Sequence, residues 1–483
     1  MSHDGFDLAA AARQEMIDHG FTPDFPKDVS DQLATIGVSI DTSLRDLRSL
    51  PWSSIDNDDS RDLDQIEWAE RSGDAIRIAV AIADVEASVA KGTPIDNFAA
   101  AQTTTVYTGV RTFPMLPERL STDLTSLAEG QDRSAVVIDM IIAADGTIQS
   151  SNTYRATVRN QAQLTYNSIG PWLENSASAP PKIAASSVLE AQLRLQDEAA
   201  QRLAAAREQH GALVFDRIET EPVITNGQVR GIAVNRHNRA AQLIEDFMIA
   251  ANESIARALR EAGISSIRRV VKDPERWPRI VELAAQFGDK LPPTPDSGAL
   301  NAFLLRRRQA DPIHYPDISL SVLKLLGPGE YIVAGPGDPE QGHFSLAAHD
   351  YTHSTAPNRR FADLVTQRLL RSLENRTTPY SGSELETIAR NCTLKEDAAR
   401  KVQRAMSKRI AAVALERRVG ESFSAVVTGV TPKGVFARVL DPPVEGRIMR
   451  GEQGLDVGDR IRVKLLGADP QRGFIDFGVL PSR

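Results

Sequence analysis

The chain carries the stretch Ile55-Asp56-Asn57-Asp58-Asp59-Ser60-Arg61-Asp62-Leu63-Asp64-Gln65, which holds five aspartates within eleven residues. The preceding segment, 50–55, predicts a strand because Pro51 disfavours a helix. Asp62 and Asp64 are two positions apart, so an extended backbone would point both carboxylates the same way. Asp56 can fold back onto them over a short loop. Carboxylates gathered this closely repel unless a cation is present, and hard divalent cations such as Mg²⁺ prefer oxygen ligands of this kind.

The residues of this stretch alone leave three interpretations open. The first is a solvated acidic loop, the common fate of a run of charge. The second is a calcium-binding EF-hand loop, because six side chains have its ligand spacing: Asp56, Asp58, Ser60, Asp62, Asp64 and Glu67. Arg61, however, stands where that loop needs glycine, and Pro51 lies where its first helix should be. The third is a catalytic magnesium site, in which metal ions stabilise the oxygens of a phosphoryl-transfer reaction.

Composition limits the class of protein. A chain of 483 residues can bury a large core and predicts two or three domains. No apolar run is long enough to span a membrane, and the N-terminus lacks the pattern of a signal peptide. The single Cys392 excludes an internal disulfide framework and favours a reducing cytoplasm. The net charge of −8 argues against non-specific coating of a polyanion, but it allows nucleic acid to bind in a local basic channel.

The pattern along the chain predicts an α+β protein with three regions: a short helical N-terminal region at 1–49, a mixed α/β domain at 50–419 and a β-barrel of the OB type at 420–483. Helices are expected at 8–18, 29–36, 187–210, 243–259 and 394–418. A capping box at Ser187 and Glu190 predicts the start of the third. Strands are expected at 75–82, 135–142, 222–224, 229–232, 423–427, 435–439, 461–465 and 474–477. Turns at Asp145-Gly146 and Asn226-Gly227 predict two hairpins.

Two further stretches contain candidate binding residues. Within 343–364, Arg359 and Arg360 follow a proline-containing turn and open a helix, an arrangement that suits a phosphate. Arg360 could equally pair with Asp363 on the surface. The second stretch, 107–127, is rich in proline and apolar residues, which is typical of buried structure. Its Tyr107 could stack on a nucleic-acid base.

Together these motifs resemble the ribonuclease II / ribonuclease R family, whose catalytic part is the RNB domain. The family's aspartate motif is similar to Ile55-Asp56 followed by Asp62-Leu63-Asp64-Gln65. Its proline segment resembles 114–121, its arginine stretch resembles 351–360, and one of its helices is similar to 243–252. The resemblance runs from about residue 50 to the C-terminus. It implies that the OB-type tail is an S1-like RNA-binding domain.

The resemblance implies a processive 3′→5′ exoribonuclease that hydrolyses single-stranded RNA to 5′-nucleoside monophosphates with Mg²⁺ or Mn²⁺. Asp56, Asp62 and position 65 would be metal ligands, and Asp64 would organise the metal and the attacking water. Arg359 would hold the phosphate at the scissile bond. The other implied RNA-binding residues are Arg360, the aromatic clamp of Tyr107 and Phe215, and Tyr166, Glu245 and Glu416 around the terminal nucleotide. We expect a monomer that acts on single-stranded RNA and has no membrane partner.

The chain also departs from the family pattern. Gln65 replaces the usual fourth aspartate, which removes one negative charge and puts the second metal position in question. Ala356 and Asn358 replace the usual residues around the arginine turn. About fifty residues precede the catalytic domain, too few for the paired cold-shock barrels typical of the family, so RNA access is expected to differ. The alternative function is a catalytically impaired RNA-binding protein of the same fold.

Overall fold

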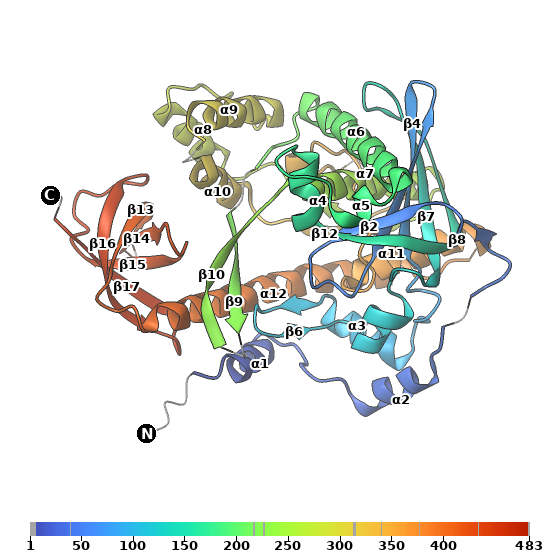
Figure 1. The fold of residues 1–483 in the computed structure, drawn as a ribbon, viewed down its shortest axis with the longest axis horizontal. Coiled ribbons are helices and arrows are strands. Elements are labelled where there is room, and N and C mark those ends of the chain that lie inside the picture. The colour runs from blue at the N-terminus through green and yellow to red at the C-terminus, as the bar shows by residue number, and fades with distance from the viewer. Residues whose placement is uncertain are drawn as a thin grey trace.

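The computed structural model describes residues 6–38, 40–215, 218–225, 228–312, 315–339, 341–375, 377–432 and 434–481. It confirms the predicted α+β class, with a mixed helix-and-sheet body followed by a closed barrel (Figure 1). None of the described helices is both long and apolar enough to cross a membrane.

The body is built around a six-stranded sheet with the order β1-β8-β2-β3-β4-β7. Its strands are β1 (Arg45–Asp46), β2 (Trp52–Asp56), β3 (Gln65–Ser72), β4 (Ala75–Ala83), β7 (Asp132–Ile142) and β8 (Ile148–Thr165). The long β8 pairs antiparallel with β7 along its first part and parallel with β2 along its end. The sheet therefore curls back on itself, and β2 ends beside the end of β8.

The predicted turn at Asp145-Gly146 connects β7 to β8. Gly146 has a φ of +84°, and a Cβ atom there would lie 2.1 Å from the backbone oxygen of Arg202. Glycine is therefore needed both for the left-handed backbone and for the close approach of α6 (Ser187–Gln209). The N-cap of α6 is Ser186, whose Oγ accepts a hydrogen bond from the Leu189 N–H. The predicted capping box of Ser187 and Glu190 is therefore wrong, because the helix has a single side-chain cap one residue earlier and leucine stands at the position that would complete a box.

Helices complete the core around the sheet. α6 and α7 (Arg239–Glu261) pack together and contact the sheet, while α11 (Phe361–Asn375) contributes apolar side chains to the same core. Shorter helices pack at the edges of the body: α2 (Lys27–Thr35), α3 (Pro94–Gln102), α4 (Tyr166–Leu173) and α5 (Pro181–Ala184).

A single long helix, α12 (Gly382–Glu416), joins the body to the barrel, as Figure 1 shows. It begins well before the predicted 394, at a capping box formed by Ser381 and Glu384. α1 (Leu8–Asp18) packs on α12 and buries Ala12 and Met16 there. The N-terminal region thus shares the core of the body instead of forming its own.

The barrel follows α12 and closes in the order β13-β14-β15-β17-β16. Its strands are β13 (Ser422–Thr431), β14 (Gly434–Val439), β15 (Glu445–Arg450), β16 (Arg460–Asp469) and β17 (Phe474–Val479). Ala411, Ala412 and Leu415 of α12 belong to the apolar core of the barrel. An ion pair of 2.7 Å between Arg438 and Asp317 also connects the barrel to α10 (Tyr315–Leu326).

The remaining elements were only partly predicted. α8 (Trp277–Gln286), α9 (Ser297–Ala310) and α10 (Tyr315–Leu326) form a three-helix unit with its own apolar core. β9 (Ile218–Thr225) and β10 (Gln228–Arg236) form the predicted hairpin, whose turn Asn226-Gly227 lies outside the described residues. Two further two-stranded sheets pair β5 (Val106–Tyr107) with β6 (Thr112–Phe113) and β11 (Ser266–Val270) with β12 (Glu330–Ala334).

Candidate functional site

The acidic stretch forms the loop between the antiparallel strands β2 and β3. Asp56 ends β2, and its Oδ1 accepts hydrogen bonds from the Asn57 N–H at 2.7 Å and the Ser60 hydroxyl at 3.0 Å. Ser126 fixes the far side of the loop, because its hydroxyl accepts from the Leu63 N–H and donates to the Arg61 carbonyl. A strand on each side excludes the EF-hand interpretation, which needs a helix on each side.

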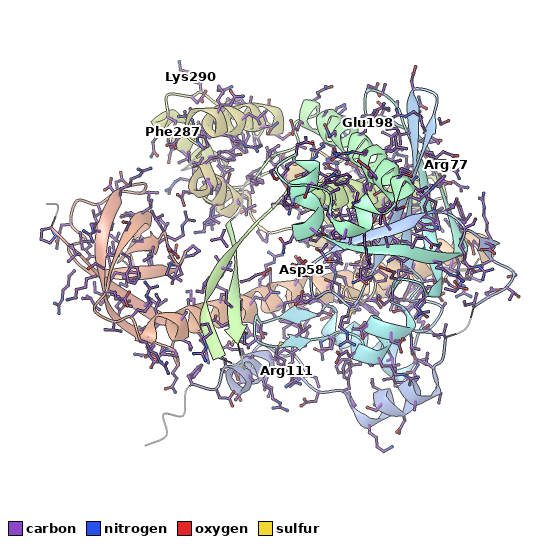
Figure 2. All side chains as sticks on the ribbon, in the orientation of Figure 1. Asp58, Arg77, Arg111, Glu198, Phe287 and Lys290 are labelled. Carbon is purple, nitrogen blue, oxygen red and sulfur yellow. The ribbon has the colours of Figure 1, made fainter. Side chains whose placement is uncertain are left out.

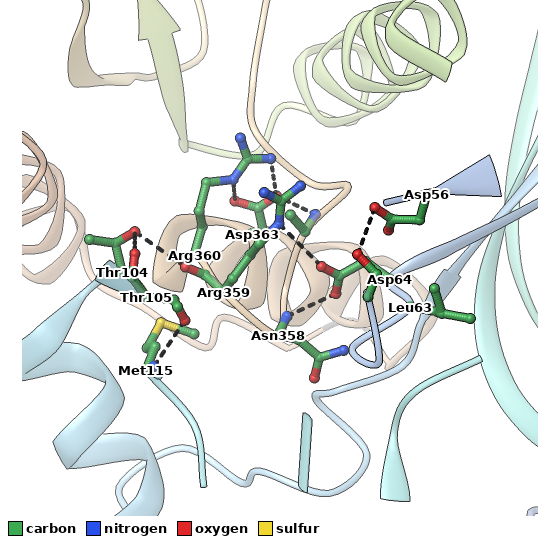
Figure 3. Close-up of polar contacts among 12 residues, drawn as sticks. Asp56, Leu63, Asp64, Thr104, Thr105, Met115, Asn358, Arg359, Arg360 and Asp363 are labelled. Atoms are coloured by element: carbon green, nitrogen blue, oxygen red, sulfur yellow. Dashed lines mark hydrogen bonds and ion pairs between the residues drawn. The ribbon is translucent and has the colours of Figure 1, made fainter. Parts of the chain in front are cut away.

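Asp64 is the most enclosed carboxylate of the loop, with only 2% of its surface exposed. Its Oδ1 accepts a hydrogen bond of 3.1 Å from the Asn358 N–H, and its Oδ2 lies 3.5 Å from Arg359 Nε (Figure 3). Burial raises the pKa of Asp64 to about 7, although Arg359 and the Asn358 N–H act in the opposite direction. A buried aspartate at this position excludes a loop that is merely solvated.

The side chain of Asp62 lies in the same acidic environment. Burial raises the pKa of Asp62, and the nearby carboxylates of Asp56 and Asp59 raise it further. Both causes disfavour the ionised form of Asp62, and a bound cation would oppose both. The loop is therefore electrostatically prepared for a cation.

The donor chemistry of this loop fits Mg²⁺ or Mn²⁺. Within the described residues, no three His, Cys, Asp or Glu side chains meet closely enough to hold a metal by themselves. Mg²⁺, however, usually keeps several waters and binds through one or two carboxylates together with phosphates of its substrate. Asp56 and Asp62, with Asp64 beside them, supply ligands of that kind.

Two segments that are far apart in sequence bring Tyr107 and Arg359 to the loop. The Arg359 carbonyl accepts hydrogen bonds from the Thr105 N–H at 2.9 Å and from the Thr104 hydroxyl at 3.3 Å, the second of which Figure 3 shows. Thr104 also forms a β-bridge with Arg360. The strand carrying Tyr107 is thereby joined to the turn carrying Arg359. Asn358, one of the departures from the family pattern, is held from the other side because its Oδ1 accepts from the Thr125 hydroxyl at 2.7 Å.

A pocket of about 1250 Å³ contains the site. Six of the predicted site residues line it: Asp56, Asp62, Asp64, Tyr107, Tyr166 and Arg359. Tyr107 is 42% exposed, so its ring is available for stacking. These six side chains supply three carboxylates, one guanidinium and two phenol rings, which together suit a nucleotide chain with a bound cation.

The other five predicted residues do not line this pocket. Gln65 is buried in β3, next to Asp64, and points to the opposite face of the strand. Arg360 donates two hydrogen bonds to Asp363, the alternative stated above, except that Asp363 is fully buried rather than on the surface. Phe215 packs against the three-helix unit. Glu245 forms an ion pair of 3.2 Å with His237, and Glu416 lies exposed at the end of α12.

Sequence reasoning missed Glu67 of β3, apart from its place in the EF-hand spacing. Its side chain is fully buried, and neither carboxylate oxygen has a hydrogen-bond partner in the described structure. Burial, together with the charge of Asp56, raises the pKa of Glu67 well above its ordinary value. The sequence signal that could have drawn attention to Glu67 is the alternation of side chains along β3, which puts Glu67 on the same face as Gln65.

The fold and this pocket define a protein with an acidic α/β body and a C-terminal OB-type barrel. The RNB domain family model matches residues 44–376, and the RNase II-type exonuclease C-terminal S1 domain matches residues 421–480. The chain therefore belongs to the RNB domain family. This confirms the resemblance drawn from its motifs.

Individual relatives agree with that assignment. Ribonuclease R 1 of Lactococcus lactis is 29% identical over 95% of this chain, which spans 59% of that relative's length. Among solved structures, Mycoplasma genitalium RNase R in complex with ribose-methylated single-stranded RNA has a TM-score of 0.88 and 24% identity, over 98% of this chain and 78% of that one. Yeast Ssd1, described as a pseudonuclease, has a TM-score of 0.73 and 18% identity, over 92% of this chain and 56% of that one. Both likenesses show the fold alone, so an assignment of activity depends on the residues of the pocket.

Proposed function

We propose that the protein is a processive 3′→5′ exoribonuclease that hydrolyses single-stranded RNA to 5′-nucleoside monophosphates with Mg²⁺ or Mn²⁺. One observation carries the proposal: Asp64 and Arg359 lie in contact in a pocket that Asp56, Asp62, Tyr107 and Tyr166 also line. The polarity and the product rest on membership of the RNB family. The lone cysteine favours action in the cytoplasm.

Different residues of the chain would contact the metal ion, the phosphate and the base in this reaction. Asp56 and Asp62 would hold the metal ion, which supplies Lewis-acid stabilisation of the phosphate oxygens when it is bound. Asp64, once ionised, accepts a hydrogen bond at one oxygen and keeps the other beside Arg359. The Arg359 side chain is 50% exposed, so its guanidinium can also contact a phosphate in the pocket. Tyr107 stacks on a base without reading its identity.

The direct test follows a labelled RNA strand over time, with Mg²⁺ and with EDTA. A 3′-labelled strand should release labelled mononucleotide at once, whereas a 5′-labelled strand should shorten from its far end. EDTA should stop both reactions. A protein that binds the strand but releases no nucleotide at any metal concentration would instead be the catalytically impaired RNA-binding protein.

Replacing Gln65 with aspartate should lower the Mg²⁺ concentration needed for the half-maximal rate severalfold. The wild type should already be active, so the substitution should not be required for activity. The added carboxylate would stand at the start of β3, directly after Asp64 in the chain, and would increase the attraction for a divalent cation through space without lining the pocket. The measurement is a Mg²⁺ titration of the hydrolysis rate for both proteins. Gln65→Asn, which keeps an uncharged amide, is the matched control. An inert wild type beside an active Gln65→Asp variant would contradict the proposed activity.

A further inference from the structure

The N-terminal region forms one wall of the catalytic pocket. Pro23, Phe25 and Leu33 line the same cavity as Asp64 and Arg359. These residues belong to the connector and α2, which follow α1 directly in the chain. The pocket is therefore shared between the N-terminal region and the catalytic body.

This wall is firmly attached to the body. The Gln32 Oε1 accepts a hydrogen bond of 2.8 Å from the Ile95 N–H of α3, and the Phe25 ring lies 4.7 Å from the Phe98 ring. α1 anchors the other end in the core beside α12. These contacts hold the wall against the body at both ends.

The wall offers an apolar surface to the pocket. Phe25 and Leu33 are partly buried, and their remaining exposed surface faces the cavity beside Pro23. Pro114 lines the same cavity from the body. Apolar and aromatic surfaces of this kind can pack against unpaired bases, because every base has an apolar face.

Two exposed arginines, Arg111 and Arg119, line the same pocket. Neither forms an ion pair with any residue that the structure describes. Two of the exposed carboxylates that line the pocket have partners, since Asp24 pairs with Arg13 and Glu118 lies 3.5 Å from Arg61. The pocket therefore has an acidic floor and, nearer its rim, two exposed guanidinium groups that form no ion pair within the described part of the chain. A polyanion would be attracted at the rim, while its end would need a metal ion at the floor.

From this arrangement we infer that 23–33, Arg111 and Arg119 form a second RNA subsite, which holds the nucleotides immediately upstream of those on the acidic floor. Bases pack against Phe25 and Leu33, and phosphates contact Arg111 and Arg119. The inference rests on the proposed function and adds to it, because it predicts that affinity depends on RNA length. It also gives the N-terminal region a direct part in substrate binding.

The test measures binding rather than hydrolysis. Fluorescence anisotropy in EDTA compares oligoadenylates of 4 and 16 nucleotides, across a salt series, for the wild type and the double variant Arg111→Ala/Arg119→Ala. Each lost phosphate contact on a single strand lowers the slope of log affinity against log salt by about 0.7, so two should lower it by about 1.4. The double variant should bind the 16-mer about tenfold more weakly at low salt, and the loss for the 4-mer should be smaller.

Lys290→Ala is the matched control for lost charge. Lys290 is exposed and lies across the molecule from Arg111 and Asp58 (Figure 2). Its removal should change neither the affinity nor the slope. An equal slope for the wild type and the arginine double variant would overturn the inference.

A second variant tests the apolar side of the subsite. Phe25→Leu keeps apolar packing against Phe98 but removes the ring that would stack. It should weaken binding of the 16-mer oligoadenylate severalfold and leave an abasic strand of equal length unaffected. The same loss for both strands would overturn base packing by Phe25. These binding results stand apart from the hydrolysis assay, so an inert wild type would refute the proposed function alone.

Discussion

Replacing Asp64 with asparagine should lower the rate of RNA hydrolysis by about 10²-fold or more, because groups that act in the transition state commonly contribute that much. Asp64 is buried at the floor of the pocket and pairs with Arg359, so the variant removes a charge at the centre of the site. Affinity for RNA should persist or increase, since several arginines and aromatic rings contribute to RNA binding. The measurements are single-turnover cleavage and equilibrium binding of the same labelled strand.

Asp58→Asn is the matched control for Asp64→Asn. It removes the same charge from the same loop, but the Asp58 carboxylate is exposed and accepts a hydrogen bond of 2.6 Å from Asn167. Its effect on the rate should be much smaller. An Asp64→Asn variant that kept more than about a tenth of the wild-type rate would contradict the assigned role.

The acidic part of the site could be predicted because it is local. A strand, a short loop and a second strand are enough to gather Asp56, Asp62 and Asp64, and each of these steps has a sequence signal. Arg359 could be connected to them only through the family resemblance. The contact itself depends on the pairing of Thr104 and Thr105 with the arginine turn, which no local pattern encodes.

Long-range packing explains what the sequence could not predict. Phe215 is directed into the core of the three-helix unit, and that core exists only once α8, α9 and α10 have assembled. Glu416 is the last residue of α12, whose final turns pack into the core of the barrel. The N-terminal helices were recognised, but their position on the pocket depends on contacts with α3 and α12, about 60 to 390 residues further along the chain. Hydrophobic periodicity predicts that one face of a helix is buried, but it does not predict which element packs against that face.

The stability of the metal-free protein should depend on pH through Asp64. The pKa of this carboxyl rises from its ordinary 3.8 to about 7 on folding, so the unfolded chain loses the proton at lower pH than the folded one. Below pH 4 the Asp64 carboxyl is protonated in both the folded and the unfolded chain, so it does not lower the free energy of unfolding. Between pH 4 and 7 the wild type loses stability, and above pH 7 the loss is complete. Three pH units correspond to at most about 4 kcal/mol.

Asp64→Asn should therefore stabilise the metal-free protein, and the gain should grow from pH 4 to pH 7 and then level off. Asparagine removes the buried charge but can still accept the hydrogen bond from the Asn358 N–H. Urea unfolding in EDTA at pH 4 to 8 measures the free energy of unfolding of both proteins. Asp74→Asn, at the exposed turn between β3 and β4, is the control and should add no such gain. A difference between wild type and Asp64→Asn that stayed constant across this range would show that the Asp64 carboxyl keeps an ordinary pKa in the folded protein. A difference that follows the expected curve would mean that the catalytic floor is destabilising until a cation binds, so that metal binding stabilises the fold as well as the site.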